Sequence, residues 1–296
     1  MKRLVFSMPW CSTTGWALRR ALGGDMGQLT VRRFPDGESY VRVHDDVEGR
    51  HVVVVAGLEH PDCKLIPLLL LLETLRELGA ASVGVVAPYL CYMRQDRRFE
   101  PGEAVSARVF PKLLSRSIDW LVTVDPHLHR IASLGEVYGA PTRVVRAAPA
   151  VARWVSNHVQ RPLLVGPDSE SEQWVRDVAE RADAPFTILQ KVRKGDRDVE
   201  VSVPDVERWR AHRPVLFDDI ISTGRTMIET LEHLRRADLP PAVCVGVHAL
   251  FSDNAYVDIL RAGPSKVVTC DTITHETNAI PLAPLLADAV RQLETA

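Results

Sequence analysis

Apolar positions along the chain follow two patterns, and each pattern predicts a different kind of element. Short continuous runs of Val, Leu and Ile predict buried strands, because strands covered on both faces are apolar throughout. Longer stretches with apolar residues three and four apart predict amphipathic helices. The predicted strands cover residues 4–8, 52–56, 83–87, 120–124, 162–165, 215–217, 243–247 and 267–269. The predicted helices cover residues 64–78, 149–159, 171–182 and 226–237.

The alternation of strands and helices predicts an α/β fold with mostly parallel sheets flanked by helices. Two strand-turn-helix patterns, beginning at His51 and Pro214, repeat one plan and indicate an internal duplication. A chain of 296 residues is long enough for two domains. We place their boundary near residues 139–147, which gives domains over 1–143 and 144–296, and we allow for a last helix that packs back on the first domain.

Charge and cysteine content exclude several classes of protein. The 36 basic and 38 acidic residues give a formal charge of -2, so no global field attracts nucleic acid or an anionic membrane. The longest leucine run, 68–72, is far shorter than the ~18 residues of a membrane span. The five cysteines include no C-x-x-C pair, which favours reduced thiols. We therefore expect a cytoplasmic protein that binds any anionic ligand at a local site.

The strongest local signal is VLFDDIISTGRTM at residues 215–227, which predicts a strand, a hydroxyl-rich loop and a helix. Phosphate is stabilised at the first turn of a helix by backbone N–H groups and the helix dipole. Hydroxyls of Ser222, Thr223 and Thr226 would add donors, and Gly224 would let the backbone approach closely. A simple helix N-cap would use the same residues without binding any ligand.

Two carboxylates, Asp218 and Asp219, stand near the end of the predicted strand in the same block. Ligands of open α/β sheets bind at the carboxyl ends of the strands. Carboxylates at such a position suit sugar hydroxyls or a metal ion. A solvated acidic turn is the alternative interpretation of this pair.

The whole block resembles the phosphoribosyl pyrophosphate signature of type I phosphoribosyltransferases and ribose-phosphate pyrophosphokinases. Four further segments occur in the order found in the pyrophosphokinases: FPDGESY at 34–40, PYLCYMRQDRRF at 88–99, TVDPHLH at 123–129 and VGPD at 165–168. The resemblance runs from residue 3 to about 290. It implies two tandem phosphoribosyltransferase-like domains of type I.

The resemblance also implies roles for individual residues. Those that would bind ATP are Phe34, Asp36, Gly37, Glu38, Arg94, Gln95 and Arg97. Those that would bind ribose 5-phosphate are Asp218, Asp219, Ser222, Thr223, Gly224, Arg225 and Thr226. The metal positions would be His127 and Asp168, with Mg²⁺ as the cofactor, and the catalytic cations would be Lys191 and Arg193. In the family the 36–38 loop reaches the nucleotide site of a neighbouring subunit, so the resemblance implies a homo-oligomer.

The implied reaction transfers the pyrophosphoryl group of Mg-ATP to the 1-hydroxyl of ribose 5-phosphate. The products would be AMP and 5-phosphoribosyl 1-pyrophosphate, which feeds nucleotide, histidine and tryptophan biosynthesis. Lys191 and Arg193 lie two apart, so in an extended strand both would face one phosphoryl group. Their charge would stabilise the AMP leaving group.

Two other functions stay open at this point. A phosphoribosyltransferase would share the 215–227 block, yet it would not need FPDGE, RQDR and K-x-R together. A non-catalytic regulatory subunit of the same family would be expected to have lost these groups, which are present here. Several motifs also have plain structural interpretations, namely a β-turn at Pro35–Gly37, a charged surface run at 94–98, a structural His127 and a solvated turn at 191–197.

The sequence departs from the family pattern at several positions. Ser222 stands where the family often has Asp, and Arg225 stands where it has a small residue. Glu170 and Ser171 replace a pair of glycines after Asp168. These departures leave every implied catalytic position in place, but they change the charge and reach of the phosphate loop.

Overall fold

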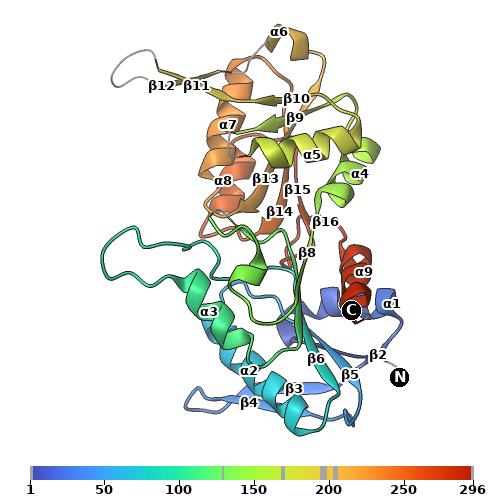
Figure 1. Cartoon of the computed structure of the whole chain (residues 1–296). Coiled ribbons are helices and arrows are strands. Elements are labelled where there is room, and N and C mark those ends of the chain that lie inside the picture. The colour runs from blue at the N-terminus through green and yellow to red at the C-terminus, as the bar shows by residue number, and fades with distance from the viewer. Residues whose placement is uncertain (1–2, 129, 168–170, 194–198, 203–205, 295–296) are drawn as a thin grey trace. The chain divides into compact units, whose positions relative to one another are not determined.

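The computed structural model describes residues 3–128, 130–167, 171–193, 199–202 and 206–294 (Figure 1). The chain divides into two compact units. Unit 1 comprises Met1–Val145, Thr272–Thr274 and Leu282–Ala296, and unit 2 comprises Arg146–Asp271 and His275–Pro281. Each unit is built around one central sheet, and all pairings within both sheets are parallel.

The sheet of unit 1 has six strands in the order β2-β1-β5-β6-β7-β8. These are β1 (Leu4–Ser7), β2 (Asp25–Met26), β5 (His51–Val55), β6 (Ser82–Ala87), β7 (Trp120–Val124) and β8 (Thr142–Val145). Its helical elements are η1 (Pro9–Cys11), α1 (Ser12–Leu22), α2 (Asp62–Glu77), α3 (Ser106–Leu114), η2 (Leu134–Glu136) and α9 (Ala283–Glu294). The last helix, α9, packs against α1 (Figure 1), and an Arg3–Glu294 ion pair of 2.6 Å joins the two chain ends within this unit.

The sheet of unit 2 also has six strands, in the order β10-β9-β13-β14-β15-β16. These are β9 (Pro162–Gly166), β10 (Phe186–Ile188), β13 (Arg213–Ile221), β14 (Val243–Ala249), β15 (Lys266–Cys270) and β16 (Asn278–Ile280). Its helices are α4 (Ala148–His158), α5 (Glu172–Ala182), α6 (Val206–Trp209), α7 (Arg225–Arg236) and α8 (Ala255–Arg261).

The two units follow the same topology. In each sheet the second strand along the chain lies at the edge, followed by the first, third, fourth, fifth and sixth. Each unit also inserts an antiparallel hairpin between its second and third sheet strands. The hairpin is β3 (Leu29–Arg33) with β4 (Ser39–Val43) in unit 1, and β11 (Gln190–Arg193) with β12 (Val199–Ser202) in unit 2. The repeated plan predicted from the two strand-turn-helix patterns is therefore confirmed at the level of topology.

Burial explains why the apolar runs became central strands. Val52 to Val55 of β5 are completely buried, as are Leu68, Leu71, Leu72 and Leu75 of the neighbouring helix α2. Residues at this spacing form one face of a helix, so α2 covers the sheet with its leucines. The predicted α/β class is confirmed. No helix in the described part of the chain is long and apolar enough to cross a membrane.

Candidate active site

The loop between β13 and α7 is formed by a strand, a left-handed glycine and a helix. Gly224 has a φ of +71°, and a Cβ at this position would lie 2.8 Å from Cδ1 of Ile259, so glycine satisfies both the backbone and the space. Gly224 directly precedes α7, and no side chain caps this helix in the described 222–228 segment. The structure thus differs from the plain side-chain N-cap. The first turn of α7 has the backbone donors that suit phosphate.

The side chains of this loop supply hydroxyl groups and one cation. Thr223, Arg225 and Thr226 are exposed, and Ser222 is half-buried. Ile228 donates its backbone N–H to the Gly224 carbonyl at 2.9 Å, which closes the first helical turn. The loop therefore presents its polar groups on a rigid helix start.

Two half-buried carboxylates, Asp218 and Asp219, precede this loop within β13. Oδ1 of Asp218 accepts the backbone N–H of Asp219 at 3.0 Å, and Oδ1 of Asp219 accepts that of Ile220 at 2.8 Å. These bonds fix both carboxylates at the carboxyl end of the strand, where ligands of such sheets bind. Groups able to donate to a phosphate and groups able to accept from sugar hydroxyls thus lie within one continuous segment.

In unit 1 the RQDR segment lies between β6 and α3 and is anchored by its aspartate. Arg94 and Arg97 are exposed, whereas Asp96 is only 7% exposed. The Asp96 carboxylate accepts the backbone N–H of Arg130 at 3.0 Å and its guanidinium at 3.1 Å. Burial raises the pKa of Asp96, but the hydrogen bonds and charge of Arg130 outweigh burial, so the pKa lies below its usual value. The buried Asp96 therefore anchors the segment, and Arg94 and Arg97 remain exposed to solvent.

A second carboxylate, Glu103, shapes the same segment. Its Oε2 accepts the backbone N–H groups of Phe99 at 2.8 Å and Glu100 at 3.1 Å, and Nε2 of Gln95 at 3.4 Å. These backbone bonds lower the pKa of Glu103. The guanidinium of Arg97 lies 4.8 Å from the centre of the Phe99 ring. The predicted nucleotide-binding side chains Gln95 and Arg97 are thus both positioned by neighbours.

The FPDGE segment forms the tip of the β3–β4 hairpin. Glu38 accepts the backbone N–H of Phe34 at 2.8 Å, and Asp36 accepts that of Glu38 at 3.2 Å through its carboxylate. Gly37 has a φ of +95°, as this tight turn requires. The expected β-turn is therefore present. All residues from 34 to 38 are exposed, so the tip is open to a ligand or a partner.

The two predicted metal positions have different outcomes. His127 is half-buried on the loop after β7, and Asp96 joins this loop to the RQDR segment through Arg130. Asp168 lies outside the described residues. Within the described ranges, no three His, Cys, Asp or Glu side chains come together as a metal shell. Mg²⁺ keeps several waters and takes further oxygens from phosphates, so a site for it does not require three protein ligands.

The two predicted catalytic cations, Lys191 and Arg193, occupy alternate positions of strand β11. They lie opposite Val201 and Val199 in the antiparallel pairing with β12. The extended backbone predicted for the K-x-R pair is thus present. The β11–β12 hairpin projects from unit 2 (Figure 1), whereas the β3–β4 hairpin runs along α2 in unit 1.

Two contributors to these segments were missed by sequence reasoning. Asp96 was interpreted as part of the charged surface run at 94–98, and Glu103 was given no role, although the Asp96 carboxylate accepts the Arg130 backbone N–H and that of Glu103 accepts the Phe99 backbone N–H. The sequence carries no signal for the burial of Asp96, because its neighbours on both sides, Arg94 to Gln95 and Arg97 to Arg98, are polar or charged.

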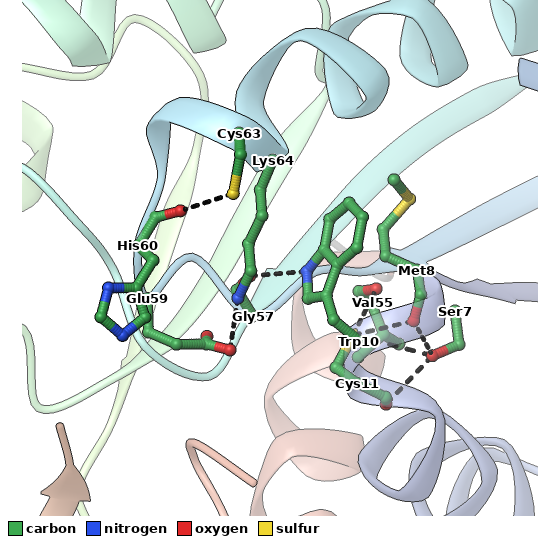
Figure 2. Close-up of polar contacts among 10 residues, drawn as sticks. All are labelled: Ser7, Met8, Trp10, Cys11, Val55, Gly57, Glu59, His60, Cys63 and Lys64. Carbon is green, nitrogen blue, oxygen red and sulfur yellow. Dashed lines mark hydrogen bonds and ion pairs between the residues drawn. The ribbon is translucent and has the colours of Figure 1, made fainter. Parts of the chain in front are cut away.

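Unit 1 has its own strand-loop-helix segment in the place that the β13–α7 loop occupies in unit 2. The loop covers 56–61, between β5 and α2, and Figure 2 shows its polar contacts. The Lys64 ammonium pairs with the Glu59 carboxylate and stands 5.5 Å from the centre of the Trp10 ring. The indole N–H of Trp10 donates to the Gly57 carbonyl at 2.8 Å. Side chains of the protein itself therefore fill this position.

Comparison with known proteins covers both units. Residues 4–117 match the N-terminal domain of ribose phosphate pyrophosphokinase, and residues 141–285 match the phosphoribosyl transferase domain. The match over residues 4–117 is to a domain of the pyrophosphokinases, so a phosphoribosyl transferase domain alone does not explain it.

Full-length relatives agree with these matches. A ribose-phosphate pyrophosphokinase of Methanothermobacter thermautotrophicus is 35% identical over 89% of this chain and 91% of that protein. One from Sulfurisphaera tokodaii is 32% identical over 88% of this chain and 89% of that protein. The crystal structure of phosphoribosylpyrophosphate synthetase from Mycobacterium smegmatis shares the fold, with a TM-score of 0.86 at 24% identity over 100% of this chain and 99% of that chain. The chain belongs to the ribose-phosphate pyrophosphokinase family.

Proposed function

We propose that this protein transfers the pyrophosphoryl group of Mg-ATP to the 1-hydroxyl of ribose 5-phosphate and releases AMP. The observation that carries the proposal is the β13–α7 loop, where Gly224 opens an uncapped helix start and two carboxylates stand near the end of the preceding strand. Such a loop binds a phosphate, and the adjacent carboxylates bind the hydroxyls of a sugar. Family membership selects ribose 5-phosphate and ATP as the substrates.

Ribose 5-phosphate would bind in unit 2. The hydroxyls of Ser222, Thr223 and Thr226 would donate to the 5-phosphate, and the exposed Arg225 would add a positive charge. Asp218 and Asp219 would accept the sugar hydroxyls. This arrangement would leave the 1-hydroxyl as the reacting group.

ATP would bind through segments of unit 1. Arg94 and Arg97 suit phosphate oxygens or the face of a base, and Asp96 holds the segment that carries them. Phe34 would stack on the purine while Asp36 and Glu38 accept hydrogen bonds from its exocyclic amine. Mg²⁺ would be held by His127, Asp168 and the phosphates of ATP, and it would neutralise their charge.

The transfer itself would be an in-line attack of the 1-hydroxyl oxygen on the β-phosphorus. A new O–P bond forms, the 1-hydroxyl proton passes to water, the bond from the β-phosphorus to the oxygen of AMP breaks, and AMP leaves with the electron pair. Lys191 and Arg193 would stabilise the charge that builds on this oxygen. No covalent intermediate is needed, because positioning and electrostatics account for most of the acceleration in phosphoryl transfer.

The direct test is incubation of the pure protein with ribose 5-phosphate, ATP and Mg²⁺, followed by detection of AMP. We expect AMP to form without any nucleobase, in equal amount to 5-phosphoribosyl 1-pyrophosphate. Omission of ribose 5-phosphate should abolish AMP release, which separates the transfer from simple ATP hydrolysis. Formation of ADP, or a requirement for a nucleobase, would contradict the proposal.

The exposed 34–38 tip is proposed to complete the nucleotide site of a neighbouring subunit in a homo-oligomer. Two inactive variants test this, one with Asp36→Ala and Glu38→Ala and one with Lys191→Ala. If the loop acts in trans, some sites of a mixed oligomer combine an intact Lys191 from one subunit with an intact 36–38 loop from its neighbour. An equal mixture of the two variants should then recover up to about a quarter of the wild-type activity, because one in four random pairings is of this kind. Light scattering gives the assembly state alongside. An active monomer would exclude the shared site.

The five free cysteines fit a cytoplasmic location of the protein, where thiols stay reduced.

A further inference from the structure

The phosphate loop of unit 2 is held by the turn that follows β14. Phe251 donates its backbone N–H to the Ile221 carbonyl at 2.8 Å, and Ser252 donates its own to the Ser222 carbonyl at 3.0 Å. These bonds follow directly on the β13–β14 pairing, whose last partners are Ile221 and Ala249. The backbone at the start of the phosphate loop is therefore fixed from one side.

The same turn is fixed in its own position. The Ser252 carbonyl accepts the backbone N–H of Ala255 at 3.1 Å, which ties the turn to the start of α8. Farther along α8, Ile259 lies against Gly224, leaving no space for a Cβ there. One helix and the turn before it thus contact both ends of the 222–224 loop.

A side-chain hydrogen bond completes this arrangement. Oγ of Ser222 and Oγ of Ser252 lie 3.2 Å apart, and either can be the donor. A hydroxyl has one proton and two lone pairs, whereas an ionised phosphate oxygen only accepts. If Ser252 donates to Ser222, the Ser222 proton stays available for a phosphate oxygen. The opposite direction would use the Ser222 proton inside the protein.

We propose that Ser252 is a positioning residue that orients the Ser222 hydroxyl as a donor to the 5-phosphate of ribose 5-phosphate. The inference rests on the proposed function and adds a residue from outside the loop to its phosphate site. Ser252 acts through Ser222 and through the loop backbone. It takes no part in the chemistry at the 1-hydroxyl, so its effect belongs to sugar-phosphate affinity.

The test compares Ser252→Ala, Ser222→Ala, the double variant and Ser252→Thr in steady-state AMP release. Ser252→Ala should raise KM for ribose 5-phosphate about three- to tenfold, the size expected for one side-chain hydrogen bond, with KM for ATP unchanged. The double variant should be no worse than Ser222→Ala, because both act through one hydroxyl. Ser252→Thr keeps the hydroxyl and should restore most of the affinity.

The matched control is Ser265→Ala, which removes a serine hydroxyl that donates to the Ala242 carbonyl at 3.0 Å elsewhere in unit 2. It should leave both KM values unchanged. Additive losses in the double variant, or an unchanged KM in Ser252→Ala, would overturn the role of Ser252 while the proposed function stands. Equal KM changes in Ser252→Ala and Ser265→Ala would also overturn it. A wild-type protein that releases no AMP would overturn the proposed function and this inference together.

Discussion

The β5–α2 loop of unit 1 and the β13–α7 loop of unit 2 stand at the same place in two sheets of identical strand order. The polar and charged groups of the two loops differ. The loop of unit 2 has three residues, no side-chain cap on α7 and a glycine with φ of +71°. The loop of unit 1 is longer, and its Glu59 carboxylate pairs with the ammonium of Lys64 in the first turn of α2. The topology repeats, but the uncapped helix start that we propose to bind phosphate does not.

The two loops also differ in how far their residues are buried. The Lys64 and Glu59 side chains are 11% and 13% exposed. Within the described residues, Oε2 of Glu59 is buried without a hydrogen-bond partner. Nearby, burial raises the pKa of the Cys11 thiol, whose Sγ donates to the Val55 carbonyl at 3.1 Å, so this cysteine stays protonated and packs as an apolar side chain. Residues 56–58 of the unit 1 loop are thus buried, whereas Thr223, Arg225 and Thr226 of the unit 2 segment are exposed.

The largest expected effect is on the stability of unit 1. Lys64→Met leaves the Glu59 charge buried without its cation, and loss of one partner of a buried pair costs about 3 to 5 kcal/mol of unfolding free energy. Urea unfolding monitored by fluorescence measures the loss. The double variant Glu59→Gln, Lys64→Met removes both charges and should recover most of it. The matched control is Arg176→Met, which breaks an exposed ion pair with Glu172 and should cost under about 1 kcal/mol. Equal losses in Lys64→Met and Arg176→Met would contradict the comparison.

The second effect concerns catalysis, and it compares one lysine from each unit. Lys191→Ala should lower kcat about 10²- to 10³-fold with little change in KM, because its charge acts as AMP leaves. The double variant Glu59→Gln, Lys64→Met should keep kcat within about twofold, since its loop takes no part in the proposed reaction. Steady-state kinetics and melting curves of both variants decide the matter. A near-normal kcat for Lys191→Ala would leave this residue as a surface charge.

The third effect separates the sugar from the nucleotide. Asp218→Asn removes a charged acceptor for sugar hydroxyls and should weaken ribose 5-phosphate about ten- to a hundredfold, with ATP binding unchanged. Substrate titrations at saturating partner substrate measure both. Equal losses for the two substrates in a folded variant would indicate that the carboxylate acts through metal binding or general stability.

The sequence predicted the parts of this molecule that depend on local pattern. The run at 52–56 became β5 because four consecutive valines are buried on both faces of a parallel strand. The hairpin strands β3 and β4 were missed, since Leu29–Arg33 and Ser39–Val43 mix apolar and basic residues and lie half-exposed. The edge strand β2 has only two residues, too few to show any periodicity.

The same division holds for the candidate site. The β13–α7 loop was predictable as a strand-loop-helix segment because its strand, hydroxyls and glycine are contiguous. The Asp96–Arg130 and Ser222–Ser252 contacts join residues 34 and 30 positions apart, so no local pattern contains them. The ion pair that fills the loop of unit 1 was also missed, because Lys64 and Glu59 look like ordinary surface charges until α2 is packed on the sheet.

The smallest expected effect is a pH dependence of protein stability that comes from His275, which lies beside the turn that holds the β13–α7 loop. The ring of His275 lies 4.5 Å from that of Phe251, whose backbone holds the loop, and burial lowers the pKa of His275 although nearby Glu276 opposes the shift. A folded pKa below the unfolded one means that the unfolded chain binds more protons as pH falls. The contribution of His275 is therefore complete above the unfolded pKa of ~6.5 and is lost as pH falls from that value through the lower folded pKa. Melting temperatures of the wild type and His275→Gln between pH 8 and pH 5 test this, because carboxylate effects are common to both. The wild type should lose on the order of 1 °C more than the variant, and parallel curves would show that His275 is not coupled to folding.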